Sequence, residues 1–232
     1  MKLKDFILLF KPGFDPVPVR EKIRASVAVT AGILLMGLAL GILHGDGYPL
    51  IMFASSGAVA TLLYVMPHSP MSQPWPLVGG NLLSATVGWG ASLFIPDPVL
   101  AAALAVGIAV FLMHLSHCLH PPGAATAMIM VLGAEQFHHH GWGWTVSAVL
   151  ANTVLSLLLA LAINNLIPGR AYPMLGTMMV PSGAVGGSSD DLGQADIEWA
   201  LTQMDSVIDV SEQDLLNIYR LASGHAAERA NK

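Results

Sequence analysis

The sequence has few charged side chains, and the middle of the chain has almost none. Asp, Glu, Lys and Arg make up 11% of its 232 residues and 54% are hydrophobic, whereas roughly a quarter of an ordinary soluble domain is charged. No Lys or Arg occurs between residues 25 and 169, and the acidic residues there are only Asp46, Asp97 and Glu135. These few charges could not keep the stretch soluble in water. We therefore expect it to face the lipid bilayer.

Cysteine and basic surface are also scarce, which excludes several functions. Cys118 is the single cysteine, so the chain has neither an internal disulfide nor a cysteine-only metal cage. Six of the ten Lys and Arg lie within residues 1–24 and no basic face exists elsewhere, so nucleic acid is not an expected partner. The Gly-x-Ser-x-Gly, His-Glu-x-x-His and phosphate-loop motifs are absent, and we expect no enzyme activity and no cofactor.

Six apolar runs predict an all-α, polytopic membrane helix bundle of about six segments. The first, third, fourth and sixth runs approach the length of about 20 residues that a helix needs to cross the hydrocarbon core. The fifth has 13 residues and Ser55, Ser56 and Gly57 interrupt the second, so we expect these two to be short or broken, either as full spans or as re-entrant segments. The runs are residues 25–43, 49–66, 77–95, 99–115, 122–134 and 145–167.

The distribution of charge predicts orientation and domain organisation. The positive-inside rule places the basic N-terminal arm and Arg170 in the cytoplasm, as expected for a bacterial inner-membrane protein with both termini cytoplasmic. We divide the chain into a basic interfacial arm (1–24), a transmembrane domain (25–175), a Gly and Ser linker (176–189) and an acidic cytoplasmic tail (190–232). Helical spacing of apolar residues predicts short helices in the tail, with disorder as the alternative. Glycines in the first and third runs permit contacts within one chain or in a homo-oligomer.

The second and fifth runs carry similar sequences, which predicts two inverted halves of three segments each. Ser-Ser-Gly-Ala-Val-Ala-Thr occupies residues 55–61 and Pro-Pro-Gly-Ala-Ala-Thr-Ala occupies residues 121–127. Each block is followed by a span that contains an asparagine, Asn81 or Asn152. Because three is odd, the second half would enter the membrane from the opposite side. The alternative is chance recurrence of small residues, which membrane helices favour for close packing.

Broken segments at matching positions point to a substrate site near the membrane midplane. Pro122 suits the first turn of a helix and Gly123 lets a ligand approach the backbone, so amide N–H groups there would bind a small monovalent anion. The serines of the second run would offer the same from the other half. A Pro-Pro turn that merely begins a helix is the alternative. The expected substrate-binding residues are Ser55, Ser56, Gly57, Thr61, His120, Pro122, Gly123, Ala124 and Thr126.

Histidines near the fifth run predict a gate or, alternatively, a metal site. His120 would gate transport or follow the proton, while His68 and His117 would line the cytoplasmic mouth. His114, His117 and His120 are three residues apart and would suit a divalent metal in a membrane sensor that signals through the acidic tail. The prolines that follow His120 argue against a continuous helix through these positions. We therefore prefer the interpretation in which these histidines bind no metal.

Residues 119–127, Leu-His-Pro-Pro-Gly-Ala-Ala-Thr-Ala, resemble the signature of the HPP family of integral membrane proteins, named for its His-Pro-Pro. Residues 67–74, 78–81, 164–166 and 172–173 also resemble the family, so that the similarity covers roughly residues 20–175. The resemblance implies a polytopic membrane protein and, for plastid and cyanobacterial members, nitrite transport. In many relatives the glycine stands one place later, and many bacterial members continue into CBS domains, through which we expect no regulation here.

Overall fold

The chain is helical in its computed structural model, which describes residues 17–44, 50–168, 170–174, 215 and 219. No β-strand occurs among these residues, which confirms the all-α prediction. Residues 1–16 of the predicted arm, the predicted linker, and all of the acidic tail except Leu215 and Tyr219 lie outside the described residues. The helices are α2 (Val19–His44), α3 (Leu50–Val65), α4 (Pro74–Phe94), α5 (Pro98–Leu115), α6 (Pro121–Leu132), α7 (Ala134–His140) and α8 (Trp142–Leu166), with a 3₁₀ turn, η2, at Pro70–Ser72.

Proline and capping residues determine where several helices begin. Pro98 follows Asp97, whose carboxylate accepts a hydrogen bond of 2.7 Å from a backbone N–H in the first turn of α5. Pro74 begins α4 and Pro121 begins α6, at positions where the missing proline N–H costs no intrahelical hydrogen bond. Gly141, with φ of +83°, ends α7 and lets α8 begin in a new direction.

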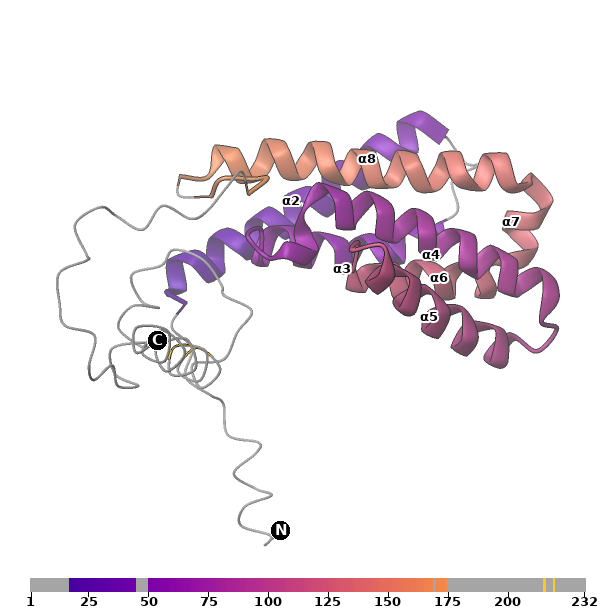
Figure 1. Ribbon diagram of the computed structural model, residues 1–232. Helices are drawn as coiled ribbons and strands as arrows, with labels where there is room; N and C mark the ends of the chain where they lie inside the picture. Colours follow the sequence, from indigo (N-terminus) through magenta and orange to yellow (C-terminus); the bar gives the residue numbers. More distant parts are fainter. Residues whose placement is uncertain (1–16, 45–49, 169, 175–214, 216–218, 220–232) are drawn as a thin grey trace, which may run out of the picture.

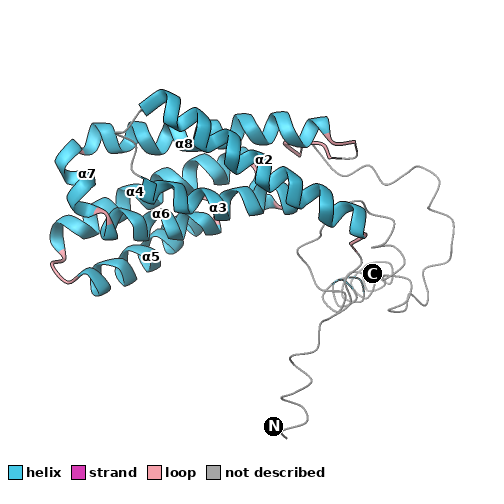
Figure 2. Ribbon diagram, turned by 180° about the vertical axis from the view of Figure 1, so that it is seen from behind, coloured by secondary structure: helices cyan, strands magenta, loops and turns pink. Residues whose placement is uncertain are grey.

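The helices run back and forth between two ends of the bundle (Figures 1 and 2). At one end, Arg170 after α8 bonds to Glu21 of α2 and to the carbonyl of Tyr64 on α3. At the other end, Ser92 Oγ of α4 lies 3.0 Å from His138 Nε2 of α7. We call these the Arg170 end and the His138 end. Six helices (α2, α3, α4, α5, α6 and α8) connect them, so α2 begins at the end where α8 finishes, as the predicted topology requires.

The six crossing helices pack as two related halves, α2 to α4 and α5, α6 and α8. Helix α2 packs on α3 as α5 packs on α6, and α8 packs on α2 and α3 as α4 packs on α5 and α6. The other principal contacts among them, α4 with α8 and α3 with α6, join equivalent helices. Equivalent helices run in opposite directions (Figure 1), because each half makes three crossings. The arrangement is that of two inverted halves, in which the last helix of each packs on the other half.

The outside of the bundle is apolar, as a lipid-facing surface requires. Helices α2, α4, α5 and α8 are long and apolar enough to cross a membrane. Large side chains such as Leu34, Phe111 and Leu158 are more than half exposed on these helices. Helix α6 has 12 residues and would rise about 18 Å. The non-helical residues 116–120 precede it and α7 follows it at the His138 end. The bundle is therefore a polytopic membrane domain.

The second apolar run is short, but it is not broken. Helix α3 is continuous over its 16 residues, and Ser55, Ser56 and Gly57 lie inside it. In a lipid environment an unpaired backbone group is costly, so the chain retains its helical hydrogen bonds through these small residues. The prediction of an interruption at 55–57 is therefore wrong. Helix α2 begins at Val19 and therefore includes residues 19–24 of the predicted interfacial arm.

Helices α4 and α6 approach each other closely through glycines. A Cβ atom at Gly80 would lie 2.6 Å from the Cβ of His120, and one at Gly123 would lie 2.8 Å from Ser84 Oγ. At Gly88 a Cβ would meet the backbone of α6. Small residues of this kind allow two helix backbones to pack tightly inside a membrane. This contact fixes the first turn of α6 against α4.

Candidate functional site

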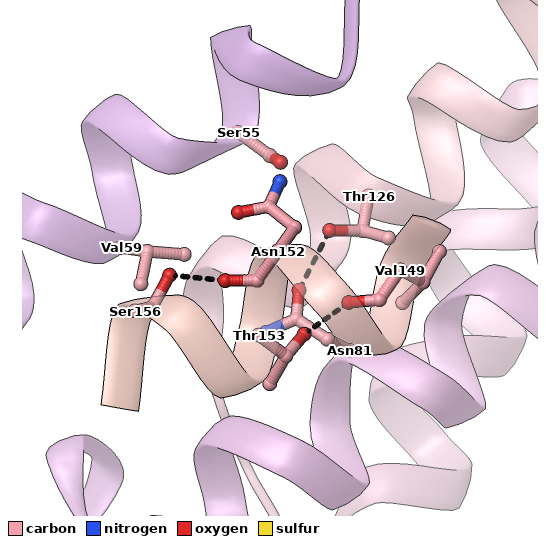
Figure 3. A pocket seen from close by; sticks show the side chains of 8 residues that line it. All are labelled: Ser55, Val59, Asn81, Thr126, Val149, Asn152, Thr153 and Ser156. Carbon is pink, nitrogen blue, oxygen red and sulfur yellow. Dashed lines mark hydrogen bonds between the residues drawn. The ribbon is translucent and has the colours of Figure 1, made fainter. Parts of the chain in front are cut away.

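A small polar cavity lies inside the bundle, between α3, α4, α6 and α8 (Figure 3). Six hydroxyl or amide side chains line it, together with Val59 and Val149. Each of the six residues is at most 7% exposed, so the helices shield the cluster from lipid and bulk water. The polar residues are Ser55 on α3, Asn81 on α4, Thr126 on α6, and Asn152, Thr153 and Ser156 on α8.

Two hydrogen bonds of the same kind join the two halves at this cavity. Thr126 of α6 donates its hydroxyl to Asn81 Oδ1 of α4 at 2.7 Å. Ser56 of α3 donates its hydroxyl to Asn152 Oδ1 of α8 at 3.1 Å. Because α3 corresponds to α6 and α4 to α8, the second bond is the counterpart of the first. Each half supplies one carboxamide, and a hydroxyl from the other half holds its oxygen.

The remaining polar groups of the cavity bond to their own helices. Thr153 donates to the Val149 carbonyl and Ser156 to the Asn152 carbonyl, both at 2.8 Å (Figure 3). Asn81 Nδ2 donates to a carbonyl one turn earlier on α4, also at 2.8 Å. These bonds satisfy the buried donors inside the bundle. A hydroxyl can rotate its hydrogen toward a solute, so the same groups are able to serve as donors to a ligand.

The cavity is uncharged and narrow. None of the residues that line it is acidic, basic or a histidine. Its volume is about 10 Å³, which is room for about one water molecule. A solute of several heavy atoms would enter only if the four surrounding helices moved apart. The structure is therefore that of a closed arrangement around a polar centre.

The predicted site residues on α3 divide into two pairs. Ser55 lines the cavity and Ser56 bonds to Asn152. Thr61 is exposed and donates its hydroxyl to the Gly57 carbonyl at 2.9 Å, and a Cβ atom at Gly57 would meet open space. Because α3 is continuous, the amide groups of residues 55–57 lie inside a helix, and the expectation of uncapped N–H donors there is wrong. The placement of Thr61 and Gly57 does not fit a role in binding.

The first turn of α6 packs against α4 and does not line the polar cavity. His120 is the N-cap residue, and Pro122 and Gly123 are buried. The Gly123 N–H donates to the His120 carbonyl at 2.8 Å, so it is not the free amide that we expected. Ala124 is half-buried and is not a lining residue. Thr126, one turn further along α6, is the predicted residue that reaches the cavity, and it does so through its side chain.

His120 is fully buried in the loop before α6. Its Nδ1 lies 2.9 Å from the Met71 carbonyl, so Nδ1 carries the proton and Nε2 is an acceptor. Among the described residues, Nε2 has no hydrogen-bond partner. Burial lowers the pKa of His120 to about 4, and the bond to Met71 opposes this only in part. The ring is therefore neutral at pH 7, and its role as a gate stays a prediction.

The metal interpretation of the histidines is wrong. No group of three or more His, Cys, Asp or Glu in the described part of the chain is arranged to hold a metal ion. His114 and His117 are exposed, whereas His120 is buried. Helix α5 ends at Leu115, and His117 adopts a φ of +51°. The three imidazoles therefore do not share one helical face.

His68 lies at the Arg170 end, between α3 and η2. Burial lowers the pKa of His68, and a hydrogen bond with the Ala171 backbone acts in the opposite direction. Arg170 lowers the pKa further, whereas Glu21 raises it. His117 is next to Ser116 in the loop after α5, and the Ser116 carbonyl accepts a hydrogen bond from the start of α4. His117 therefore also lies at the Arg170 end. The assignment of His68 and His117 to a mouth stays a prediction.

Four residues of the polar cavity were not predicted as site residues: Asn81, Asn152, Thr153 and Ser156. The sequence contained a signal for two of them, because Asn81 and Asn152 occupy equivalent apolar spans of the two halves. An amide inside a lipid-spanning helix needs a partner, so matching amides indicate a shared polar interior. Thr153 and Ser156 gave no such signal, because threonine and serine bonded to their own helix are common in membrane spans.

An apolar surface around an uncharged polar centre, built by two inverted halves, defines a polytopic membrane protein with an internal site. The chain matches the family model described as "HPP, transmembrane region" over residues 15–173. It therefore belongs to the HPP family of integral membrane proteins. None of the solved structures matches it.

Two curated relatives are transmembrane proteins of Dictyostelium discoideum. One is 34% identical over 164 residues, which cover 68% of this chain and 57% of the relative. The other is 35% identical over 179 residues, which cover 73% of this chain and 57% of the relative. The chain thus spans little more than half the length of these relatives.

Proposed function

We propose that this chain transports a small monovalent anion, with nitrite as the first candidate, through the polar cavity between its two halves. The observation that carries the proposal is the matched pair of hydrogen bonds, Thr126 to Asn81 and Ser56 to Asn152. These bonds place two carboxamides and several hydroxyls in the interior of a membrane domain. The resemblance to nitrite-transporting members of the family supports nitrite. The proposal assigns the chain no catalytic chemistry.

The hydrogen-bond pattern favours an anion over a cation. The Oδ1 atoms of Asn81 and Asn152 each accept one hydroxyl hydrogen from the other half, and the carboxamide nitrogens of these side chains can act only as donors. Asn81 uses one of its two Nδ2 hydrogens within α4. A hard cation would instead require carboxylates or several carbonyl oxygens, and no carboxylate lines the cavity.

An uncharged site also favours an anion of low charge and the rapid release of that anion. A buried lysine or arginine would bind an anion strongly and slow its departure, whereas neutral donors bind it weakly enough for passage. A divalent anion would lose far more hydration energy on entering such a site than a monovalent one. Nitrite combines a single charge with oxygen acceptors for several donors. The cavity must still widen to admit it, because the cavity volume is about 10 Å³.

The proposed orientation places the Arg170 end in the cytoplasm of a bacterial inner membrane. Six Lys and Arg precede residue 25, and Arg170 is the next basic residue. Arg20, Lys22 and Arg24 in α2 and Arg170 after α8 lie at the Arg170 end, because α2 begins there and α8 finishes there. Cytoplasmic loops and flanks of membrane spans are enriched in Lys and Arg. Under this orientation His68 and His120 lie on the cytoplasmic side of the polar cavity.

The test is nitrite uptake into proteoliposomes by the Thr126→Val variant. Valine keeps the shape of threonine and removes the hydroxyl, so Asn81 loses its partner and the cavity loses a donor. We expect uptake to fall by about tenfold, which corresponds to the loss of one buried hydrogen bond. The matched control is Thr61→Val, because Thr61 is exposed on the outer face of α3. Its uptake should equal that of the wild type.

Three results would contradict the proposal. Wild-type uptake of nitrite no faster than in protein-free liposomes, with nitrate and chloride equally inactive, would exclude anion transport. Equal uptake by Thr126→Val and the wild type would show that any transport bypasses the polar cavity. A loss that Thr61→Val shares would assign the effect to general packing instead of the cavity.

A further inference from the structure

A second cavity extends from the polar cavity toward the Arg170 end. It lies between α2, α3 and α8, and its volume is again about 10 Å³. Val59 and Ser156 line both cavities, and Ser55 of the first is followed by Ser56 of the second. On α3 the lining of the second cavity continues to Tyr64, near the helix end that adjoins Arg170. The two cavities therefore lie along one line, which stops at Tyr64.

Tyr64 closes the far end of the second cavity. Its ring packs so tightly on α2 that a Cβ atom at Gly32 would collide with it. The residue is 2% exposed. Its carbonyl accepts a hydrogen bond from Arg170 Nη1 at 2.8 Å. The residue that blocks the cavity is thus held in place by Arg170.

Arg170 also joins α2 to the segment that follows α8. Its Nε donates to Glu21 Oε1 at 2.7 Å, and its Nη2 contacts the same oxygen. Arg170 is 4% exposed and Glu21 is 8% exposed. In the described part of the chain this is the one ion pair with both partners buried, because Arg24, 3.8 Å from the other Glu21 oxygen, is more exposed. The ion pair connects the first helix of one half to the end of the other.

A buried ion pair contributes little net free energy to the stability of a fold. The cost of removing two charges from water offsets most of their attraction, and an apolar pair of similar size often stabilises as well or better. Arg170 is also the only Lys or Arg between residues 25 and 219. An ion pair that either forms or breaks does provide two discrete states, which is what a switching contact between two rigid parts requires.

We propose that Glu21, Arg170 and Tyr64 form the gate at this end of the path, and that Arg170 exchanges the Glu21 carboxylate for the transported anion when the gate opens. The identity of the anion rests on the proposed function, whereas the gate does not. The planar guanidinium suits anions that present two oxygens on one atom, as carboxylate and nitrite both do. When Arg170 turns to such an anion it releases the Tyr64 carbonyl, so α3 is freed to move away from α2.

The gate is tested by the accessibility of a cysteine behind it. Cys118 is first replaced by alanine, and Ser156→Cys then places a thiol between the two cavities. In proteoliposomes, a small membrane-impermeant methanethiosulfonate is added on the side where a separate Ala171→Cys variant reacts. We expect Glu21→Gln to raise the labelling rate at position 156 by about tenfold, as a shift toward the open state would. Arg20→Gln removes a charge beside Glu21 from an exposed position and should leave the rate unchanged.

The anion exchange is tested by the concentration dependence of nitrite uptake. The double variant Glu21→Gln/Arg170→Gln keeps the pair neutral, so it avoids a lone buried charge that could prevent folding. The cysteine at position 156 should be labelled as fast in this double variant as in Glu21→Gln. Half-maximal uptake should require about tenfold more nitrite, because one charge-assisted contact is lost. Glu21→Gln/Arg170→Lys keeps the charge without the planar fork and should give an intermediate value.

These results separate the gate from the transport proposal. Labelling that does not change in Glu21→Gln would overturn the gate, whether or not nitrite is transported. Faster labelling without any nitrite uptake by the wild type would retain the gate and overturn the proposed function. Equal half-maximal concentrations for Glu21→Gln and the double variant would overturn the binding role of Arg170.

Discussion

The Thr126 hydroxyl is hydrogen-bonded to Asn81 Oδ1 at 2.7 Å, and this bond ties the two halves of the domain together. Both residues are at most 5% exposed. Removal of either partner leaves the other polar group buried without its hydrogen bond, which is more costly than the bond itself is favourable. The bond therefore contributes to stability as well as to the chemistry of the polar cavity.

A double-mutant cycle on Thr126→Val and Asn81→Leu should show this coupling. We expect an interaction free energy of about 0.6 kcal/mol, the average for polar pairs between membrane helices, and of at most about 1.7 kcal/mol. The measurement is reversible unfolding in detergent micelles. The control cycle pairs Asn81→Leu with Thr86→Val, because Thr86 is exposed on the same helix and bonds to its own backbone. Coupling as large in the control cycle would show that the pair is not specific.

The glycine contact between α4 and α6 should tolerate no side chain. Gly80→Ala would bring a Cβ atom to 2.9 Å from the Cys118 carbonyl and closer still to His120. We expect a loss of about 1 to 3 kcal/mol, typical of overpacking. Gly90→Ala, on the same helix, would meet nothing within 4 Å and should be neutral or slightly stabilising. Thermal unfolding of the two variants gives the comparison, and similar midpoints would contradict the packing.

His120 should make the domain less stable in acid. Burial lowers the pKa of His120 from 6.5 to about 4, so between these values the unfolded chain binds a proton that the folded chain does not. The contribution of His120 to stability is therefore complete above pH 6.5 and is lost as the pH falls toward about 4, by at most roughly 3 kcal/mol.

The His120→Gln variant tests this pH dependence, because glutamine keeps an N–H donor and cannot gain a charge here. Its unfolding midpoint should change less between pH 7 and pH 5 than that of the wild type. His139→Gln, at an exposed position, is the matched control and should retain the wild-type slope. A wild-type slope in His120→Gln would mean that other groups cause the acid sensitivity.

His117→Gly should stabilise the domain. His117 is exposed and holds a φ of +51°, a left-handed conformation that glycine adopts without steric cost. The expected gain is about 1 kcal/mol. Nitrite uptake should remain at the wild-type level if the imidazole has no role at the mouth. A fall in uptake with unchanged stability would support the sequence-based assignment of His117 to the mouth.

The architecture was predictable because it depends on quantities that a sequence displays. The lengths of the apolar runs and the absence of Lys and Arg from residues 25–169 determine which parts can lie in lipid. The repeated block in the second and fifth runs indicated the inverted halves. The continuity of α3 was not predictable in the same way, because serine and glycine occur both inside continuous helices and at helix breaks. The surroundings in the fold decide between the two.

The site was predictable only in part, because it depends on which neighbour each residue faces. Gly123 fits a backbone that approaches a ligand as well as one that approaches another helix, and the structure shows the second. Ser55, Ser56 and Thr126 were expected to bind mainly through backbone N–H groups, with the serine hydroxyls as additional donors, whereas in the structure their side chains line the cavity or bond across it. Glu21 was assigned to the interfacial arm, and its bond to Arg170 spans 149 positions of sequence, which no local pattern reveals.

The small volume of the two cavities would limit the rate at which ions cross. Each has a volume of about 10 Å³, too little for a hydrated ion to diffuse through. Under the proposed function, every anion that crosses would therefore need its own cycle of helix separation and return, and collective motions of this kind take microseconds to milliseconds. Flux would saturate at the turnover of a carrier, and between cycles the protein would leave the electrochemical gradients of its membrane intact.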